Sequence, residues 1–198
     1  MKLPFGINEC KRGKSFFGFP LLLYYGGKKR ILYLKGDVFM SENKFRWKPF
    51  LVCLAIPILG GTLAGLISMG GMEIFAAVNK PPLSPPAWLF PVVWTILYAL
   101  MGIASYLVYN SDSGREEKRR ALTVYGVQLL FNFIWPVLFF NFRMYYFAFF
   151  WLVALWALII YTMVLFDRIR KSAAYLLTPY LLWVTFAGYL NLGIAVLN

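Results

Sequence analysis

Aromatic and amide side chains recur at helical spacing in three separate apolar stretches of the sequence. Trp94 and Tyr98 are four residues apart, so they would share one face of a helix. Two further stripes have comparable spacing: Gln128, Asn132, Trp135 and Phe139, then Trp183, Ala187 and Asn191. On neighbouring helices these stripes would supply aromatic walls, small floor positions and a few amides. That combination favours non-covalent binding of a flat apolar ring, by stacking and by a few hydrogen bonds.

A porphyrin suits such a site, because its macrocycle gains from stacking and apolar burial while its polar edge needs a few donors. Gln128 and Asn132 are the candidate hydrogen-bonding groups. Two interpretations of Asn132 stay open, ligand contact or bonding to a neighbouring helix, and the aromatic residues also suit membrane interfaces and cores. The candidate ligand-binding residues are Pro91, Trp94, Tyr98, Gln128, Asn132, Trp135, Trp183 and Ala187.

The sequence offers little for acid–base or metal chemistry. It contains no histidine, so the commonest neutral axial ligand of haem iron is missing and a metal-free porphyrin is favoured. Cys10 and Cys53 lack metal-site spacing, and we expect no metal site. No catalytic residue is identified beyond Trp94 and Trp183, which an excited porphyrin beside them could oxidise.

The composition places the chain in a bilayer. Of its 198 residues 61% are hydrophobic, 20% aromatic and 14% charged, too apolar for a soluble domain of this size. Runs of about 20 apolar residues predict an all-α membrane protein, a five-transmembrane-helix bundle. The predicted spans are 50–69, 87–109, 121–142, 145–166 and 173–197. All eight acidic residues fall outside them, which argues against a proton-coupled pump.

The net charge of +12 follows the predicted topology. One side carries ten basic residues and the opposite side only Lys80 and Arg143, a positive-inside pattern that predicts a cytoplasmic N-terminal side. Topology and anionic lipid therefore explain the charge, and no nucleic-acid partner is expected. The ten are Lys44, Arg46, Lys48, Arg115, Lys118, Arg119, Arg120, Arg168, Arg170 and Lys171.

Residues 1–40 differ in character from residues 41–198, which hold all five spans. The first forty carry eight Lys or Arg and a short apolar run, Phe16–Tyr25, that is too short to span a bilayer. We interpret them as an atypical basic N-terminal extension. Translation from Met40 is the alternative, and in that case the extension is not translated.

The connection between the first two spans is rich in proline. Four prolines, at positions 81, 82, 85 and 86, fix φ and push the residues before them toward extended geometry. A plain helix-stopping connector is one interpretation, and a structured lid over one mouth of the bundle is the other. In the first span, Gly61 and Gly65 have the small-xxx-small spacing of close helix contacts, either within the bundle or between subunits.

Three separated motifs resemble the TspO/MBR family, the translocator proteins once called peripheral benzodiazepine receptors. They are KPPLSPPAWLFPVVW, LLFNFIWPVLFF and LTPYLLWVTFAGYLN, in the order expected for the family. The resemblance implies a five-helix membrane protein, often a homodimer, with porphyrins bound beneath the loop that joins the first two helices. No obligatory cofactor is implied. Leu83 and Trp151 depart from the family pattern, and no basic residue follows Tyr189, so sterol binding is not expected.

Three functions compete on this basis. A membrane receptor or sensor that binds tetrapyrroles, without obligatory turnover, is the first. A light-dependent porphyrin-degrading enzyme is the second, and a transporter of tetrapyrroles or other hydrophobic small molecules is the third. The expected location is the cell membrane, with the mitochondrial outer membrane as the alternative. The expected partners are a porphyrin or another planar hydrophobic ligand, membrane lipid and a second copy of the chain.

Overall fold

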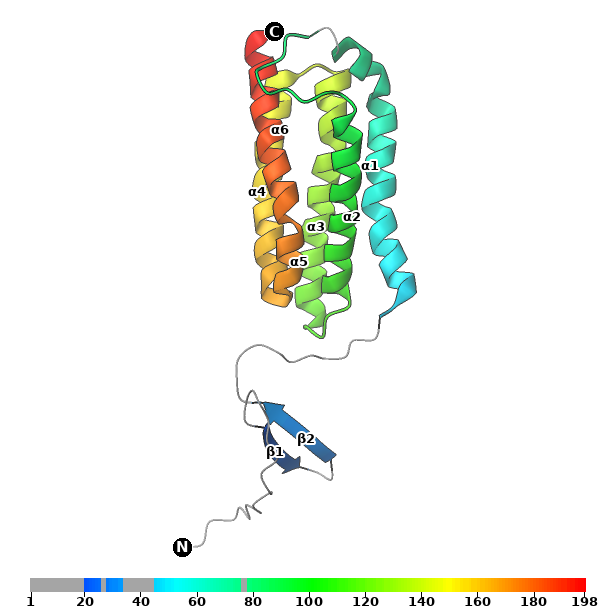
Figure 1. Ribbon diagram of the computed structural model, residues 1–198, viewed down its shortest axis with the longest axis vertical. Helices are drawn as coiled ribbons and strands as arrows, with labels where there is room; N and C mark the ends of the chain where they lie inside the picture. The colour runs from blue at the N-terminus through cyan, green and yellow to red at the C-terminus, as the bar shows by residue number, and fades with distance from the viewer. Residues whose placement is uncertain (1–19, 26–27, 34–44, 76–77) are drawn as a thin grey trace, which may run out of the picture. The chain divides into compact units, whose positions relative to one another are not determined.

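The computed structural model describes residues 20–25, 28–33, 45–75 and 78–198. The chain divides into two units, Met1–Glu42 and Asn43–Asn198 (Figure 1). In the first, β1 (Pro20–Tyr25) pairs antiparallel with β2 (Lys28–Tyr33). The predicted apolar run thus supplies a strand. The remainder of the predicted extension, Met40 included, lies outside the described residues.

Five helical segments of the second unit are long and apolar enough to cross a membrane, as predicted. They are α1 (Trp47–Phe75), α2 (Leu89–Tyr109), α3 (Arg115–Pro136) continued by η1 (Val137–Asn141), α4 (Tyr145–Ile169), and α5 (Lys171–Leu176) continued by α6 (Thr178–Leu197). The third segment begins six residues earlier than its predicted span. Glu116 and Glu117 lie in its first turn, where carboxylates interact favourably with the helix dipole.

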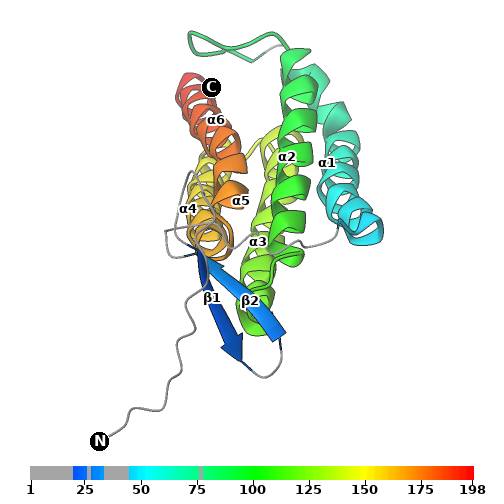
Figure 2. The same ribbon diagram turned by 60° about the horizontal axis from the view of Figure 1, so that its bottom comes forward.

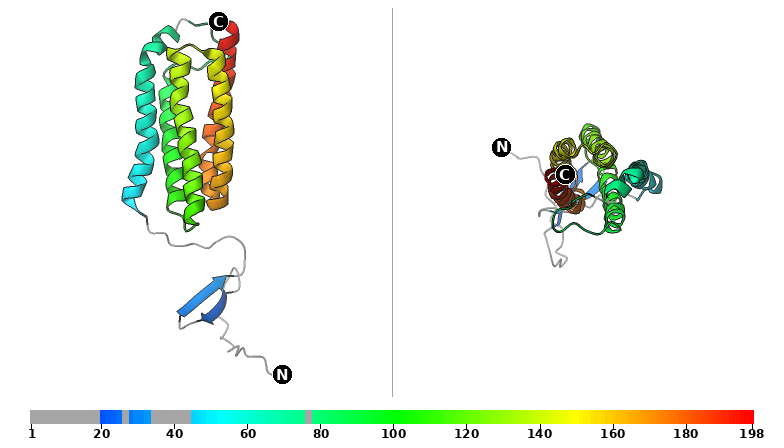
Figure 3. Two further views of the ribbon diagram at one scale, coloured as in Figure 1. Left: turned by 180° about the vertical axis from the view of Figure 1, so that it is seen from behind. Right: turned by 90° about the horizontal axis from the view of Figure 1, so that it is seen from above.

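Four of these segments form a ring of neighbours. Helix α2 contacts α3, α3 contacts α4, α4 contacts both α5 and α6, and α5 returns to α2. Helix α1 packs outside the ring, against α2, α3 and η1 (Figures 2 and 3). Only 11% of its apolar window is buried, against 33 to 44% in the other spans. Most of the surface of α1 therefore faces lipid.

Two prolines interrupt the helical hydrogen bonding near the core. Pro136 lacks the N–H that would continue α3, and the next five residues form the π-helix η1. Pro179 lies in the first turn of α6, after a break at Leu177 that separates α6 from α5.

The described part of the loop between α1 and α2 is fastened to α6. Pro81 is buried against Gly193, where an added Cβ would lie 2.7 Å from the proline ring. Tyr189 Oη donates to the Pro82 carbonyl at 2.9 Å, and Asn198 Nδ2 donates to the Asn79 carbonyl at 3.0 Å. The loop is therefore held in one place and is more than a plain connector. We call this end of the bundle the loop end, and the opposite end, which carries Arg46, Arg115 and Lys171, the basic end.

Candidate functional site

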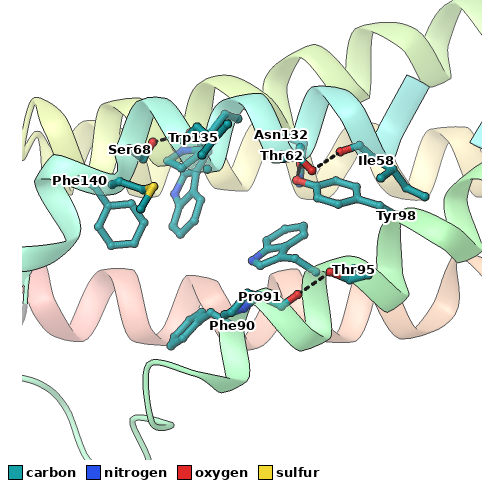
Figure 4. Close-up of a pocket in the computed structure, with 17 residues that line it drawn as sticks. Ile58, Thr62, Ser68, Phe90, Pro91, Thr95, Tyr98, Asn132, Trp135 and Phe140 are labelled. Carbon is teal, nitrogen blue, oxygen red and sulfur yellow. Dashed lines mark hydrogen bonds between the residues drawn. The ribbon is translucent and has the colours of Figure 1, made fainter. Parts of the chain in front are cut away.

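The main cavity lies between α1 and the α2–α3 pair, nearer the loop end (Figure 4). Its volume is about 380 Å³. Helix α1 lines it from Ile58 to Met69, α2 from Phe90 to Tyr98, and α3 with η1 from Asn132 to Phe140. A volume of this size is within the usual range for sites that hold small organic molecules.

Aromatic rings form two of the cavity walls. The rings of Trp94 and Tyr98 stack with centroids 5.4 Å apart and planes inclined by 28°. On the opposite side Trp135 meets Phe140 edge to face at 6.2 Å. Trp135 is held from behind, because its Nε1 donates to Asn191 Oδ1 at 3.1 Å. The walls are thus flat and fixed by packing before any ligand binds.

A chain of hydrogen bonds leads from the cavity wall into the core. Tyr98 Oη donates to Asn132 Oδ1 at 2.8 Å, and Asn132 Nδ2 donates to Tyr180 Oη at 3.1 Å. Gln128 Nε2 donates to the same Tyr180 oxygen at 2.6 Å. Asn132 therefore bonds to α2 and α6 while also lining the cavity, so the two interpretations of this residue do not exclude each other.

The serine and threonine hydroxyl groups in the lining are already paired within their own helices. Thr62 donates to the carbonyl of Ile58, Ser68 to that of Ala64 and Thr95 to that of Pro91, each at 2.8 Å. Among the side chains that the structure describes, those that line the main cavity are all uncharged. This described part of the lining is accordingly suited to an apolar ligand.

A smaller cavity of about 30 Å³ lies under the described loop residues. Lys80, Ser84 and Pro85 line it from the loop, and Ala187 and Asn191 from α6. It shares three walls with the main cavity: Phe90, Trp135 and Phe140. These three rings therefore separate the larger space from the loop.

Comparison with known proteins agrees with this arrangement. The model of the TspO/MBR family matches residues 53–197. The tryptophan-rich protein TspO of Chlorobaculum tepidum is 37% identical over 147 residues, 74% of this chain and 91% of that protein. The translocator protein of Bos taurus is 35% identical over 73% of this chain and 87% of its own length. The tryptophan-rich sensory protein of Cereibacter sphaeroides is 34% identical over 77% and 92%.

The chain belongs to the TspO/MBR family. It is a multi-pass membrane protein of the sensor or binding type, because the five spans and the family agree on that description. The matched region begins inside α1 and includes every residue that lines the two cavities. The comparisons leave the ligand of this TspO/MBR protein open.

Five of the eight candidate ligand-binding residues line the main cavity: Pro91, Trp94, Tyr98, Asn132 and Trp135. The other three do not. Gln128 is fully buried and, like Asn132, donates to Tyr180 Oη. Ala187 lines the smaller cavity, and Trp183 packs edge to face on Phe90 with ring centroids 5.9 Å apart. Trp183 Nε1 is buried and has no hydrogen-bond partner among the described residues.

Sequence reasoning missed the contribution of α1 and of Tyr180. Tyr180, Val184, Ala187 and Asn191 are all buried, so the inward face of α6 runs through Tyr180 and leaves Trp183 at its edge. Extending the predicted stripe of Trp183, Ala187 and Asn191 by one turn toward the N-terminus would have reached Tyr180. On α1, Gly61 and Gly65 both line the cavity. Their spacing indicated a close contact, but gave no sign that one of them would face a hollow.

The described residues give little support for acid–base or metal chemistry within the membrane. They contain no cluster of three or more His, Cys, Asp or Glu side chains able to hold a metal ion. In the cavity the reactive candidates are the oxidisable rings, of which Trp94 lies in the wall.

Proposed function

We propose that this TspO/MBR protein is a membrane sensor that binds a metal-free porphyrin in the cavity between α1, α2 and α3. One observation carries the proposal: the stacked Trp94 and Tyr98 rings face an apolar hollow of about 380 Å³ that also holds the amide of Asn132. Flat aromatic walls favour stacking on a macrocycle. The name of the Cereibacter sphaeroides relative, a sensory protein, supports the sensor role.

The charge of the lining sets the pose of the ligand. A porphyrin carboxylate would be costly to bury among uncharged side chains, so the carboxylates belong near water while the ring occupies the cavity. Among the described residues that line the two cavities, the basic one is Lys80, in the smaller cavity at the loop end. We therefore place the carboxylates toward the loop end.

Tryptophan fluorescence tests the proposal directly. Titration of protoporphyrin into the protein in lipid nanodiscs should quench tryptophan emission with a saturable curve. Trp94→Leu should weaken affinity about fivefold, since a stacked aromatic contact is worth about 1 kcal/mol beyond its buried area. Trp156→Leu is the matched control, because Trp156 lies on α4 and bonds to Thr185, away from the cavity.

Other outcomes of the same experiment favour the competing functions. Absence of saturable quenching contradicts the proposal. Loss of porphyrin absorbance under illumination, over several turnovers per protein, would support the light-dependent enzyme, with Trp94 in the wall as its first candidate residue. Net movement of porphyrin into proteoliposomes would support the transporter.

We propose the cell membrane as the location, with the basic end in the cytoplasm. The ten basic residues gather at one end of the five spans by sequence, and the positive-inside rule places such an end in the cytoplasm. A homodimer in the membrane remains part of this proposal, to be tested by the mass of the particle in nanodiscs.

A further inference from the structure

Helix α1 follows α2 closely from the basic end only as far as Gly61. An added Cβ on Gly102 of α2 would lie 2.8 Å from Leu54 Cα, and one on Gly61 would overlap the ring of Tyr98. One turn further on, an added Cβ on Gly65 would meet no heavy atom within 4 Å. The close contact between α1 and α2 therefore ends between Gly61 and Gly65.

Beyond that point α1 is held by η1. An added Cβ on Gly71 would lie 2.5 Å from the backbone of Phe140, and Asn141 Nδ2 donates to the Ile67 carbonyl at 2.9 Å. The outer turns of α1 thus pack toward the end of α3. This change of partner leaves an opening between α1 and α2 at the level of Gly65.

The rim of this opening is exposed and yet lines the cavity. Leu66 and Met69 of α1 are each 59% exposed while they contribute to the cavity wall. Pro91 and Thr95 of α2 are exposed lining residues on the other side. Because both helices cross the membrane, this rim faces hydrocarbon. The main cavity is therefore open sideways, toward lipid.

The loop end offers a less accessible route. None of the described loop residues, 78–88, lines the main cavity. The rings of Phe90, Trp135 and Phe140 stand between that cavity and the loop. Passage from the loop side would require displacing these rings and the contacts that hold the loop on α6. Among the described residues at the opening, Thr62, Ser68 and Thr95 donate within their own helices, so passage between α1 and α2 would break none of these hydrogen bonds.

We infer that a flat apolar ligand enters and leaves the cavity sideways from the hydrocarbon of the bilayer, through the opening between α1 and α2. The inference rests on the proposed function and adds its route and its source, a ligand dissolved in lipid. Such a ligand is already concentrated in the membrane, since apolar surface leaves water favourably. Its approach needs no release of the loop.

Two reversible staples test the route, each in a Cys10→Ser, Cys53→Ala background. The first joins Leu66→Cys to Thr95→Cys across the opening with a cleavable bis-maleimide. The second joins Asn79→Cys to Asn198→Cys and locks the loop on α6. Each protein is stapled in detergent and placed in nanodiscs. Mixing with protoporphyrin-loaded vesicles then gives the rate of tryptophan quenching, and mixing loaded nanodiscs with empty vesicles gives the rate of release.

The staple across the opening should slow both quenching and release about tenfold or more, and cleavage of the linker should restore them, as expected when a gate limits passage. The loop staple should leave both rates within about twofold of the unstapled protein. Unchanged rates with the first staple, or slowing by the loop staple alone, would overturn the sideways route while equilibrium quenching persists. Absence of equilibrium quenching in the unstapled protein would instead reject the proposed function and, with it, this inference.

Discussion

Tyr180 joins the cavity wall to the core through a single oxygen atom. It is fully buried, and its hydroxyl oxygen accepts hydrogen bonds from Gln128 at 2.6 Å and from Asn132 at 3.1 Å. Within a membrane these two amides have no water to turn to if that acceptor is lost. The orientation of Asn132, and through it of Tyr98, therefore depends on a residue that does not line the main cavity.

Tyr180→Phe should accordingly lower stability and loosen the site. It leaves two buried amide donors without their acceptor, which should cost about 1 to 2 kcal/mol in the free energy of unfolding. Unfolding in mixed detergent micelles with rising dodecyl sulfate measures this cost. Tyr175→Phe is the matched control, because Tyr175 is 72% exposed. Equal stability of the two variants would show that Tyr180 is not a structural centre.

At the scale of the helices, two glycines one turn apart on α1 meet opposite surroundings. Gly61 is pressed against the ring of Tyr98, and Gly65 faces open space. Both have the same sequence context of small residues four apart, so their difference comes from where α1 turns away from α2. The tight contact at Gly61 bounds the cavity toward the basic end. The open position at Gly65 forms part of the opening between α1 and α2.

Alanine at these two positions should therefore behave differently. Gly61→Ala must displace the Tyr98 ring, and overpacking of this kind costs about 1 to 3 kcal/mol. The shift should also disturb the hydrogen bond from Tyr98 to Asn132. Gly65→Ala should leave the free energy of unfolding nearly unchanged. Dodecyl sulfate unfolding compares the two, and a larger loss for Gly65→Ala would contradict the helix geometry described here.

The sequence predicted the helices better than their contacts. Apolar length alone located the five spans, and the stripe of Gln128, Asn132 and Trp135 on α3 is indeed buried. It could not tell whether Gly61 and Gly65 pack within the bundle or between subunits, because both contacts need small residues. The π-helix after Pro136 turns Phe140 into the cavity wall, and no periodicity of 3.6 residues anticipates that.

At the scale of the whole molecule, charge distinguishes the two ends of the membrane unit. Helix α3 begins among basic residues, and Arg119 pairs there with Glu116 at 2.8 Å in an exposed position. The connection from α1 to α2 and the turn at Arg143 lie at the other end of the spans. Orientation in the membrane therefore decides which compartment the loop faces.

A membrane-impermeant maleimide tests that orientation in intact cells. In a Cys10→Ser, Cys53→Ala background, Leu83→Cys should be labelled from outside, since Leu83 is 82% exposed in the loop. Ser113→Cys, in the connection between α2 and α3, should be labelled only after the membrane is opened. The reverse pattern would place the loop in the cytoplasm and reject the proposed topology.

The five-residue π turn of η1 also affects how the cavity tolerates a change in chain length. Its i→i+5 hydrogen bond, from Phe142 N–H to the Val137 carbonyl, encloses one residue more than an α turn, so loss of one residue from this turn would restore an ordinary α turn. The later side chains would keep their direction, with Phe140 in the wall and Asn141 within reach of Ile67. Loss of one residue within the α-helical part of α3 would instead rotate every later side chain by about 100°. A single-codon deletion should thus be tolerated inside η1 and disruptive one turn before it.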